Sequence, residues 1–184
     1  MKPAPTPPPP TGFTLPERLI VLAIVGVLLA AALPSLRTYT QNQQLAGAAN
    51  AFLGALNLAR SEAIRRGARV DLAPRDGIRW ESGWLVFVNK PGDANLQFDA
   101  GDALIYSHEK LPDGLTMDTT LTDKSAPYIA YNGNGRTRNN MSDRAPLWGS
   151  WQFSLGGRSR LVRLGILGRA RICNPADDVT CTFR

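Results

Sequence analysis

The strongest constraint on the fold of this chain is a long apolar run near its N-terminus. Leu19 to Leu33 holds neither a charge nor a proline, and the wider stretch Phe13 to Leu36 spans 24 residues whose only charges are Glu17 and Arg18. A helix rises about 1.5 Å per residue, so 24 residues cross the roughly 30 Å hydrocarbon core of a bilayer. The run therefore predicts a helix that lies in a membrane or packs among other apolar helices.

Three interpretations of this run are open. Six of the ten residues from Met1 to Pro10 are prolines, so the segment ahead of the run forms neither a helix nor a strand. A secretory signal peptide would be cleaved at Ala30-Ala31-Ala32, although Lys2 is the only basic residue ahead of Glu17. A membrane anchor would keep the run in lipid. A helix that packs among other helices needs a partner for Glu17, because an unpaired carboxylate is costly in lipid.

The helical pattern continues beyond the apolar run. Between Ser35 and Arg66 the apolar residues step by three and four, which is the spacing of one helix face. Arg65 and Arg66 suit the negative end of the helix dipole, and Gly67 suits a C-terminal cap. We predict one helix from Phe13 to Arg66 whose second half packs on a head through Leu45, Ala49, Phe52, Leu56, Ala59 and Ala63.

Short strand patterns separated by turn residues fill the rest of the chain. They predict an α+β fold, in which a C-terminal antiparallel β head of two small sheets packs on the long N-terminal helix. Trp80, Trp84, Phe87 and Trp151 are expected in the head core, and Trp148, in a loop, is the tryptophan expected to be exposed. The candidate strands are Arg69–Leu72, Gly83–Asn89, Ala103–His108, Leu115–Thr119, Tyr128–Asn132, Ser150–Ser154, Arg160–Leu167 and Arg169–Cys173.

The composition leaves little for an enzyme or a metal site. One histidine, His108, and two cysteines cannot supply a Cys/His metal cage and offer little to a Ser-His-Asp or Cys-His centre. A loop with Asp93, Asn95, Asp99 and Asp102 is rich in oxygen ligands, but its spacing fits no EF-hand, so a solvated turn is favoured over a calcium site. We expect no catalytic residue, no metal and no cofactor.

The N-terminal segment nevertheless points to a known family. Gly12-Phe13-Thr14-Leu15-Pro16-Glu17, followed by the apolar run and Pro34, resembles the class III signal of type IV pilins and pseudopilins. The resemblance implies that a prepilin peptidase cleaves after Gly12 and methylates the new terminal Phe13. It also implies that Glu17 serves subunit assembly by pairing with the terminal amine of a neighbouring subunit. The chain would then be a single-pass inner-membrane protein whose head is periplasmic or lies in an extracellular filament.

Further segments resemble the GspH/FimT branch of these pilin-like proteins, which includes the minor pseudopilin of type II secretion and a minor pilin implicated in DNA uptake. They cover nearly the whole chain from Gly12 onward, and their order is the specific signal. The segments are Ala59–Gly67, Trp80, Gly83–Phe87, Tyr131–Arg136 and Gly168–Cys173. The resemblance divides the chain into a leader peptide (1–12), a membrane or filament helix (13–34), an amphipathic helix that continues into the head (35–67), and the β-rich head with its basic tail (68–184).

The extracytoplasmic location that the resemblance implies also bears on the two cysteines. Cys173 and Cys181 are expected to form a disulfide, because such a head lies in an oxidising space. The alternative is a pair of reduced, buried thiols. A disulfide across so short a loop contributes about 2–3 kcal/mol on the chain-entropy model.

The positive charge of the chain is concentrated at its C-terminal end. From Gly133 to Arg184 there are nine arginines, no lysine and three aspartates, a net charge of +6. In an extended strand Arg163, Arg169 and Arg171 would share one face, opposite Val162, Leu164 and Ile166. Arginine suits bidentate binding of phosphate, and a patch of this kind is typical of polyanion-binding proteins. The alternatives are a solvated strand face and pairing with the acidic loop.

The resemblance strengthens the nucleic-acid interpretation. DNA-uptake pilins of this branch carry a Gly-Arg-x-Arg motif in the tail, matched here by Gly168, Arg169 and Arg171. Gly135-Arg136-Thr137-Arg138 repeats the pattern in a loop, so Arg136 and Arg138 are further candidates for DNA binding.

The resulting functional prediction is a minor pilin or pseudopilin, not an enzyme, that acts in the assembly of a type IV pilus or a type II secretion pseudopilus. Its tail would bind double-stranded DNA without sequence preference. Its partners would be the prepilin peptidase, other pilins or pseudopilins, the membrane, and either DNA or a secreted cargo. One alternative is a protein-secretion pseudopilin that binds no DNA. The other is a soluble binding protein, secreted by an ordinary signal peptide cleaved near Ala32.

Overall fold

The structure is a computed structural model that describes residues 14–90, 96–140 and 145–183, apart from the side chains of residues 31–34. It divides into two compact units, Met1–Thr40 and Gln41–Arg184. A single helix, α1 (Leu15–Arg66), begins in the first unit and ends in the second. The predicted first helical residue, Phe13, lies outside the described residues.

The first unit is helical from Leu15 onward, and its described apolar side chains are exposed. The apolar residues with large side chains from Leu15 to Leu29 are between 43% and 74% exposed. By length and composition this part of α1 could cross a membrane. Thr14 and Glu17 have the spacing of a capping box, and the Thr14 N–H donates to Glu17 Oε2 at 3.4 Å. Pro16 is tolerated because it lies in the first turn, where a missing N–H breaks no helical bond.

The C-terminal end of α1 is stopped by Gly67, as the sequence predicts. Gly67 has φ +60°, its N–H donates to Ile64, and the N–H of Ala68 donates to Ala63. This pair of bonds is the Schellman motif, which satisfies carbonyls at the helix end. Glu62 accepts hydrogen bonds from both terminal arginines, at 2.6 Å from Arg65 Nη2 and 2.8 Å from Arg66 Nε. These bonds, with that of Arg65 the stronger influence, lower the pKa of Glu62 to about 2.

The second unit contains two four-stranded sheets in which every strand pair is antiparallel. The first sheet has the order β3-β2-β1-β5, formed by β1 (Val70–Pro74), β2 (Trp84–Val88), β3 (Ala103–His108) and β5 (Ile129–Tyr131). The second has the order β4-β6-β7-β8, formed by β4 (Thr116–Leu121), β6 (Gly149–Leu155), β7 (Arg158–Leu164) and β8 (Ala170–Cys173). A short 3₁₀ helix, Trp80–Ser82, precedes β2. The α+β head of two small sheets is confirmed.

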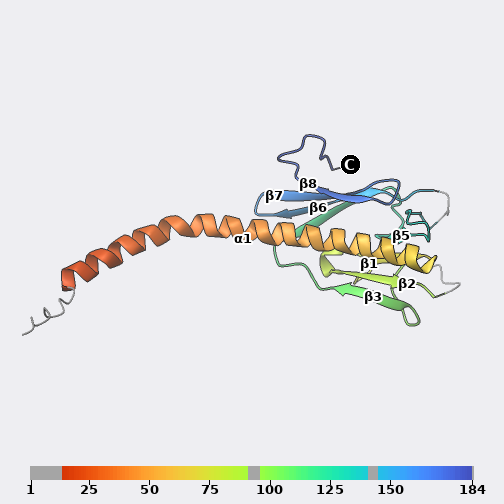
Figure 1. Cartoon of the computed structure of the whole chain (residues 1–184), viewed down its shortest axis with the longest axis horizontal. Helices are drawn as coiled ribbons and strands as arrows, with labels where there is room; N and C mark the ends of the chain where they lie inside the picture. Colours follow the sequence, from red (N-terminus) through yellow and green to blue (C-terminus); the bar gives the residue numbers. More distant parts are fainter. Residues whose placement is uncertain (1–13, 91–95, 141–144, 184) are drawn as a thin grey trace, which may run out of the picture. The chain divides into compact units, whose positions relative to one another are not determined.

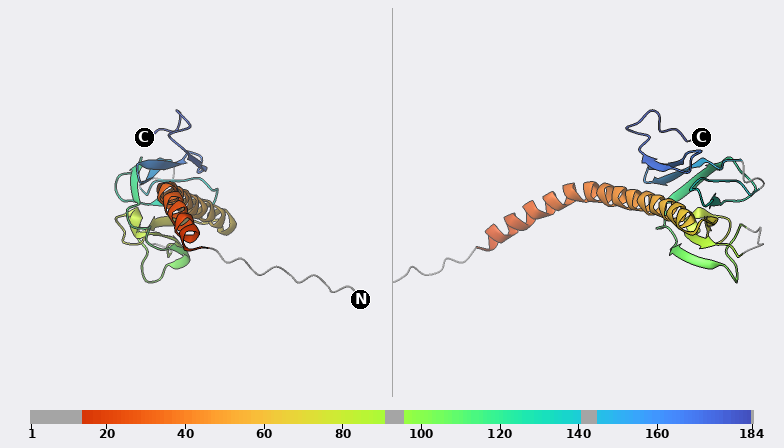
Figure 2. Two further views of the ribbon diagram at one scale, coloured as in Figure 1. Left: turned by 90° about the vertical axis from the view of Figure 1, so that its left-hand side faces the viewer. Right: turned by 45° about the vertical axis from the view of Figure 1, so that its right-hand side comes forward.

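The head core forms where the second half of α1 meets both sheets. In Figures 1 and 2 strands β1, β2 and β3 of the first sheet lie on one side of this part of the helix, and β6, β7 and β8 of the second sheet lie on the other. The predicted helix stripe is confirmed, since each of its residues is at most 1% exposed; these residues are Leu45, Ala49, Phe52, Leu56, Ala59 and Ala63. The Phe52 ring is the centre of the core, with the ring centroids of Trp84 and Trp151 at 5.1 and 5.0 Å.

The four aromatic residues predicted for the core are all buried, but one of them lies apart. Trp80, Trp84 and Trp151 belong to the cluster around Phe52. Phe87 is buried outside this cluster, where its ring meets Phe98 edge-on at 5.5 Å. Each predicted strand is present. The largest difference is that β7 ends at Leu164 rather than at Leu167, and this difference shapes the candidate site.

Candidate nucleic-acid interface

The arginine-rich end of the chain is a hairpin of β7 and β8, so the two strands predicted here are present, but Arg163, Arg169 and Arg171 do not lie along one extended strand. The chain turns between Leu164 and Ala170, where Gly165 N–H donates to Arg169 O and Gly168 N–H donates to Gly165 O, both at 2.9 Å. The exposed Ile166 lies in this turn and lines the same cavity as the arginines, so the expectation that it lies on the opposite face with Val162 and Leu164 is wrong. Gly168 explains the difference, because its φ of +75° permits a tight reversal within an apolar sequence.

The hairpin still brings the predicted arginines together. They meet because β7 and β8 pair side by side, and not because they alternate along a single strand. Arg163 on β7 lies directly opposite Arg171 on β8. Residues opposite one another in an antiparallel pair project from the same face of the sheet. Arg169, two residues before Arg171, shares that face by alternation. Arg169 and Arg171 are exposed, and Arg163 is half-buried.

The second Gly-Arg segment lies against the first. Gly168 has φ +75°, and a Cβ built on it would lie 2.5 Å from Gly135 O and 3.3 Å from the Cα of Arg136. The two backbones therefore approach more closely than any other residue would allow. This contact places the exposed Arg136 beside the turn that precedes Arg169. We call Arg136, Arg163, Arg169 and Arg171 the arginine cluster.

Arg138 does not join this cluster in the same way. Its side chain is half-buried, and its Nη1 donates to the neighbouring Thr137 O at 2.8 Å. Thr137 is buried and donates from its hydroxyl to Leu147 O. Arg158 and Arg160 are also separate, since they lie at the opposite end of β7, paired with Leu155 and Phe153 of β6.

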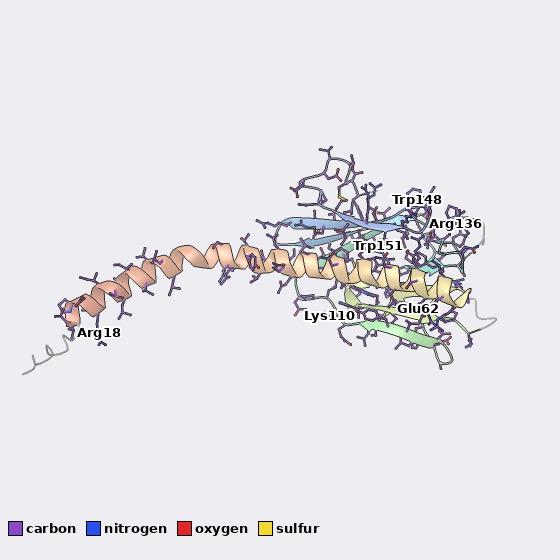
Figure 3. All side chains as sticks on the ribbon, in the orientation of Figure 1. Arg18, Glu62, Lys110, Arg136, Trp148 and Trp151 are labelled. Atoms are coloured by element: carbon purple, nitrogen blue, oxygen red, sulfur yellow. A yellow bond between two sulfur atoms is a disulfide. The ribbon has the colours of Figure 1, made fainter. Side chains whose placement is uncertain are left out.

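A surface cavity of about 370 Å³ opens at the cluster. Three of its lining side chains are arginines of the cluster, and a fourth is Trp148, which is 42% exposed. The expectation that Trp148 is the exposed tryptophan is confirmed. Figure 3 shows Trp148 and Arg136 at the same end of the head, while Trp151 lies in its middle. The lining residues are Trp148, Arg163, Leu164, Gly165, Ile166, Arg169 and Arg171.

The arginines of the cluster are not paired directly with carboxylates of the described residues. Among the described residues, no ion pair within 4.0 Å involves any of its four arginines. The proposed alternative of pairing with the acidic loop is therefore not seen for Asp99 and Asp102, although Asp93 and Asn95 lie outside the described residues. Asp99 instead has Lys90 Nζ at 3.4 Å. Where the chain is described, no group of three acidic, histidine or cysteine side chains could hold a metal ion.

The disulfide fixes the tail beside the cluster. Cys173 and Cys181 are bonded, with their Cα atoms 5.9 Å apart, as expected. The loop that they close presents Thr180 O to Arg163 Nη1 at 3.0 Å. It also carries Asp178, whose pKa is lowered by hydrogen bonds from Thr180 and further by the positive charge of Arg171 and Arg163. Asp178 was not foreseen as a neighbour of the cluster, because only the disulfide brings it back to β7.

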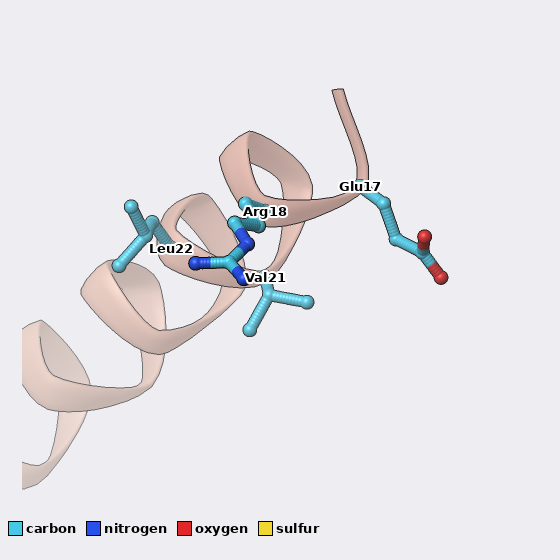
Figure 4. Close-up of a pocket in the computed structure, with 4 residues that line it drawn as sticks. All are labelled: Glu17, Arg18, Val21 and Leu22. Carbon is cyan, nitrogen blue, oxygen red and sulfur yellow. The ribbon is translucent and has the colours of Figure 1, made fainter. Parts of the chain in front are cut away.

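The predicted processing and assembly residues lie in the first unit. Gly12 and Phe13 are outside the described residues. Glu17 is exposed, and Figure 4 shows its carboxylate directed away from the helix, with Val21 and Leu22 on the next turn. Its described contact is the hydrogen bond from the N–H of Thr14, which leaves the carboxylate accessible for a second partner.

Comparisons with known proteins agree on the class of fold. The family model described as type II transport protein GspH matches residues 48–168. The pilin-like protein PilA1 of Thermus thermophilus is 39% identical over 97 residues, which are 53% of this chain and only 58% of that protein.

Two solved structures extend the likeness. The type IV minor pilin FimU of Pseudomonas aeruginosa aligns with a TM-score of 0.57 and 17% identity, over 75% of this chain and 94% of that chain. The minor pseudopilin EpsH from the type 2 secretion system of Vibrio cholerae aligns with a TM-score of 0.50 and 16% identity, over 72% and 98%. At such identities the two structures establish a shared fold and nothing more.

Proposed function

The chain belongs to the GspH family of type II transport proteins, and on that premise we propose that it is a minor pilin or pseudopilin that binds DNA through the arginine cluster. In this proposal the protein is a structural subunit, not an enzyme. The apolar first half of α1 anchors it in the inner membrane and later packs among other pilin helices. Its partners are other pilins or pseudopilins, together with the prepilin peptidase that cleaves after Gly12 and methylates Phe13.

The N-terminal part of the proposal rests on the apolar helix and on Glu17. The carboxylate of Glu17 is exposed at the first turn, close in sequence to the proposed new terminus at Phe13. A neighbouring terminal amine would neutralise it, which removes the cost of a lone carboxylate in lipid. Mass spectrometry of the mature N-terminus tests this step. An N-methylated Phe13 is expected, whereas a start near Leu33 would identify a secreted protein with an ordinary signal peptide.

DNA binding is supported above all by the gathering of Arg163, Arg169 and Arg171 at one cavity with no carboxylate bound to them. An arginine that no carboxylate holds can offer paired N–H groups to a phosphate, and Arg163 has further N–H donors beyond the one that Thr180 O accepts. Such contacts recognise the backbone and not the bases, so binding without sequence preference is expected. Arg136 would extend the phosphate-binding surface across the Gly168–Gly135 contact.

The hairpin supplies its own matched control for this proposal. In Arg169→Ala/Arg171→Ala two charges are lost from the cluster, and in Arg158→Ala/Arg160→Ala two charges are lost from the other end of β7. We expect the first pair to weaken binding of labelled duplex DNA by the full-length protein in nonionic detergent at least tenfold. We also expect it to reduce the slope of log affinity against log salt by about 2, at about 0.9 per phosphate contact. The second pair should have a much smaller effect.

Equal losses from the two pairs would mean that binding follows net charge and not this site. No loss from either pair would favour the alternative, a pseudopilin that serves protein secretion without binding DNA. The family description, type II transport protein, favours that alternative.

A further inference from the structure

We propose that the cavity beside Trp148 holds one unpaired nucleotide, so that the protein binds single-stranded DNA, or the frayed end of a duplex, more tightly than closed duplex DNA. This inference rests on the proposed DNA binding, because the same arginines would hold the phosphates. It adds a second type of contact, the stacking of a base on an indole ring.

The exposure of Trp148 is the first observation. The other three tryptophans are at most 2% exposed and lie in the core, whereas Trp148 is 42% exposed in the wall of the cavity. A single exposed tryptophan is common on protein surfaces, but one in the wall of a cavity lined by arginines places an aromatic ring where a ligand can reach it.

The backbone that carries Trp148 is fixed. Its N–H donates to Thr122 Oγ1 at 3.1 Å, and its carbonyl accepts from the N–H of Thr122 at 3.0 Å. The next residue, Gly149, has no room for a side chain because Thr120 O lies where a Cβ would be. The indole is therefore attached to an ordered end of the paired strands β4 and β6 of the second sheet. A platform that is already ordered loses little entropy when a base stacks on it.

The chemistry around the indole fits a nucleotide better than an apolar ligand. Trp148 and Ile166 offer apolar surface, while Arg163, Arg169 and Arg171 offer cationic groups at the same cavity. Proteins that bind single strands combine these two elements, an aromatic ring under the base and a basic groove along the backbone. The cavity, of about 370 Å³, lies near the lower end of the range for small-molecule sites and is sized for one nucleotide.

Closed duplex DNA cannot use the indole. Its bases are stacked on one another and present only their edges in the grooves, so it meets the protein through phosphates. A base must leave the stack to reach Trp148, which costs a few kcal/mol in a closed duplex and less in a single strand, where no base pair has to be broken. The arginine cluster should therefore serve both forms of DNA, and Trp148 only the unpaired one.

Two substitutions at position 148 separate stacking from general packing. Trp148→Leu keeps apolar bulk without an aromatic face, whereas Trp148→Phe keeps a smaller aromatic face. Each full-length variant, in nonionic detergent, would be titrated with a labelled single strand of about 20 nucleotides and with a duplex closed by hairpin loops at both ends. Trp148→Leu should weaken binding of the single strand about tenfold and leave the closed duplex within about twofold. Trp148→Phe should retain most of the single-strand affinity.

Tryptophan fluorescence gives a second readout. The single strand should quench part of the wild-type emission, and this quenching should be absent in Trp148→Leu, where only buried tryptophans remain. The inference is overturned if Trp148→Leu binds the single strand like the wild type, or if it weakens both DNAs equally. Failure of the proposed function would look different, because then Arg169→Ala/Arg171→Ala would leave binding of the closed duplex unchanged.

Discussion

Replacing Gly168 by alanine should disrupt the site without removing any charge from it. Gly168 has φ +75°, and an added Cβ would lie 2.5 Å from Gly135 O and 3.1 Å from Tyr131 Cε1. The carbonyl cannot easily move away, because Gly135 also has a positive φ and Ile64 of α1 lies against it. Gly165, in the same turn, is the matched control, since the nearest atom to its added Cβ is Arg169 O at an ordinary 3.6 Å.

The expected cost has two parts. Holding alanine in the left-handed region costs about 1–2 kcal/mol. Forcing a methyl group against a backbone that cannot retreat costs about 1–3 kcal/mol more. The unfolding free energy of Gly168→Ala should therefore fall by about 2–5 kcal/mol. In a domain of this size each kcal/mol lowers the melting temperature by about 2–4 °C, so a decrease of roughly 4–20 °C is expected.

Tryptophan fluorescence is the appropriate probe for this measurement. Trp80, Trp84 and Trp151 are buried in the head core and report its unfolding. Gly165→Ala should melt within about 2 °C of the wild type, because it meets neither strain nor a clash. Gly168→Ala should also bind DNA more weakly, although all its arginines remain, because the two Gly-Arg segments must separate. If the two alanine variants have the same melting temperature, the contact between Gly168 and Gly135 does not stabilise the site.

Two further predictions concern stability. Burial raises the pKa of Asp71 to about 6 from an ordinary 3.8, against the opposing effect of Arg69 2.7 Å away. Because this pKa is higher in the folded state, the contribution of Asp71 is greatest below about pH 4 and is lost, by about 3 kcal/mol, as the pH rises through about 6. Urea unfolding across this pH range should show the unfolding free energy declining in the wild type and not in Asp71→Asn. If the two proteins lose stability in parallel as the pH rises, Asp71 is not the group responsible. Cys173→Ser/Cys181→Ser should lower the unfolding free energy by about 2–3 kcal/mol. A reductant should lower the unfolding free energy of the wild type by the same amount and leave that of the variant unchanged. A wild type whose stability does not respond to reductant would contradict a stabilising role of the disulfide.

Local sequence signals predicted the architecture of the head well. The buried stripe from Leu45 to Ala63 follows from helical periodicity, and the end of α1 follows from Gly67. Strands bounded by glycine- and proline-containing turns were found for the same reason. The exposure of Trp148 was also predictable, because it lies outside the strand pattern and next to Gly149. In each case the deciding information lies within a few residues in the sequence.

The details of the site depend on contacts that are distant in the sequence. Gly165-Ile166-Leu167 reads as the continuation of an apolar strand, so the sequence predicts that the first strand ends at Leu167 and places Ile166 on the face of Val162 and Leu164, whereas β7 ends at Leu164. The register of β7 against β8 is set by tertiary contacts. The pairing of Arg163 with Arg171 therefore does not follow from the alternation of residues along the sequence. The burial of Asp71 was equally hidden, because a charged residue in a strand normally faces solvent.

The structure gives the two Gly-Arg segments a common physical basis. Glycine at positions 135 and 168 lets two backbones touch, and that contact holds neighbouring arginines close together even though like charges repel. Within the described part of the chain no ion pair relieves this repulsion, and Asp178 offsets part of it, since its pKa is lowered by hydrogen bonds from Thr180 and further by the charges of Arg171 and Arg163. In the proposed function a phosphate backbone would offset the remainder, and a stacked base would use the one exposed tryptophan among the four.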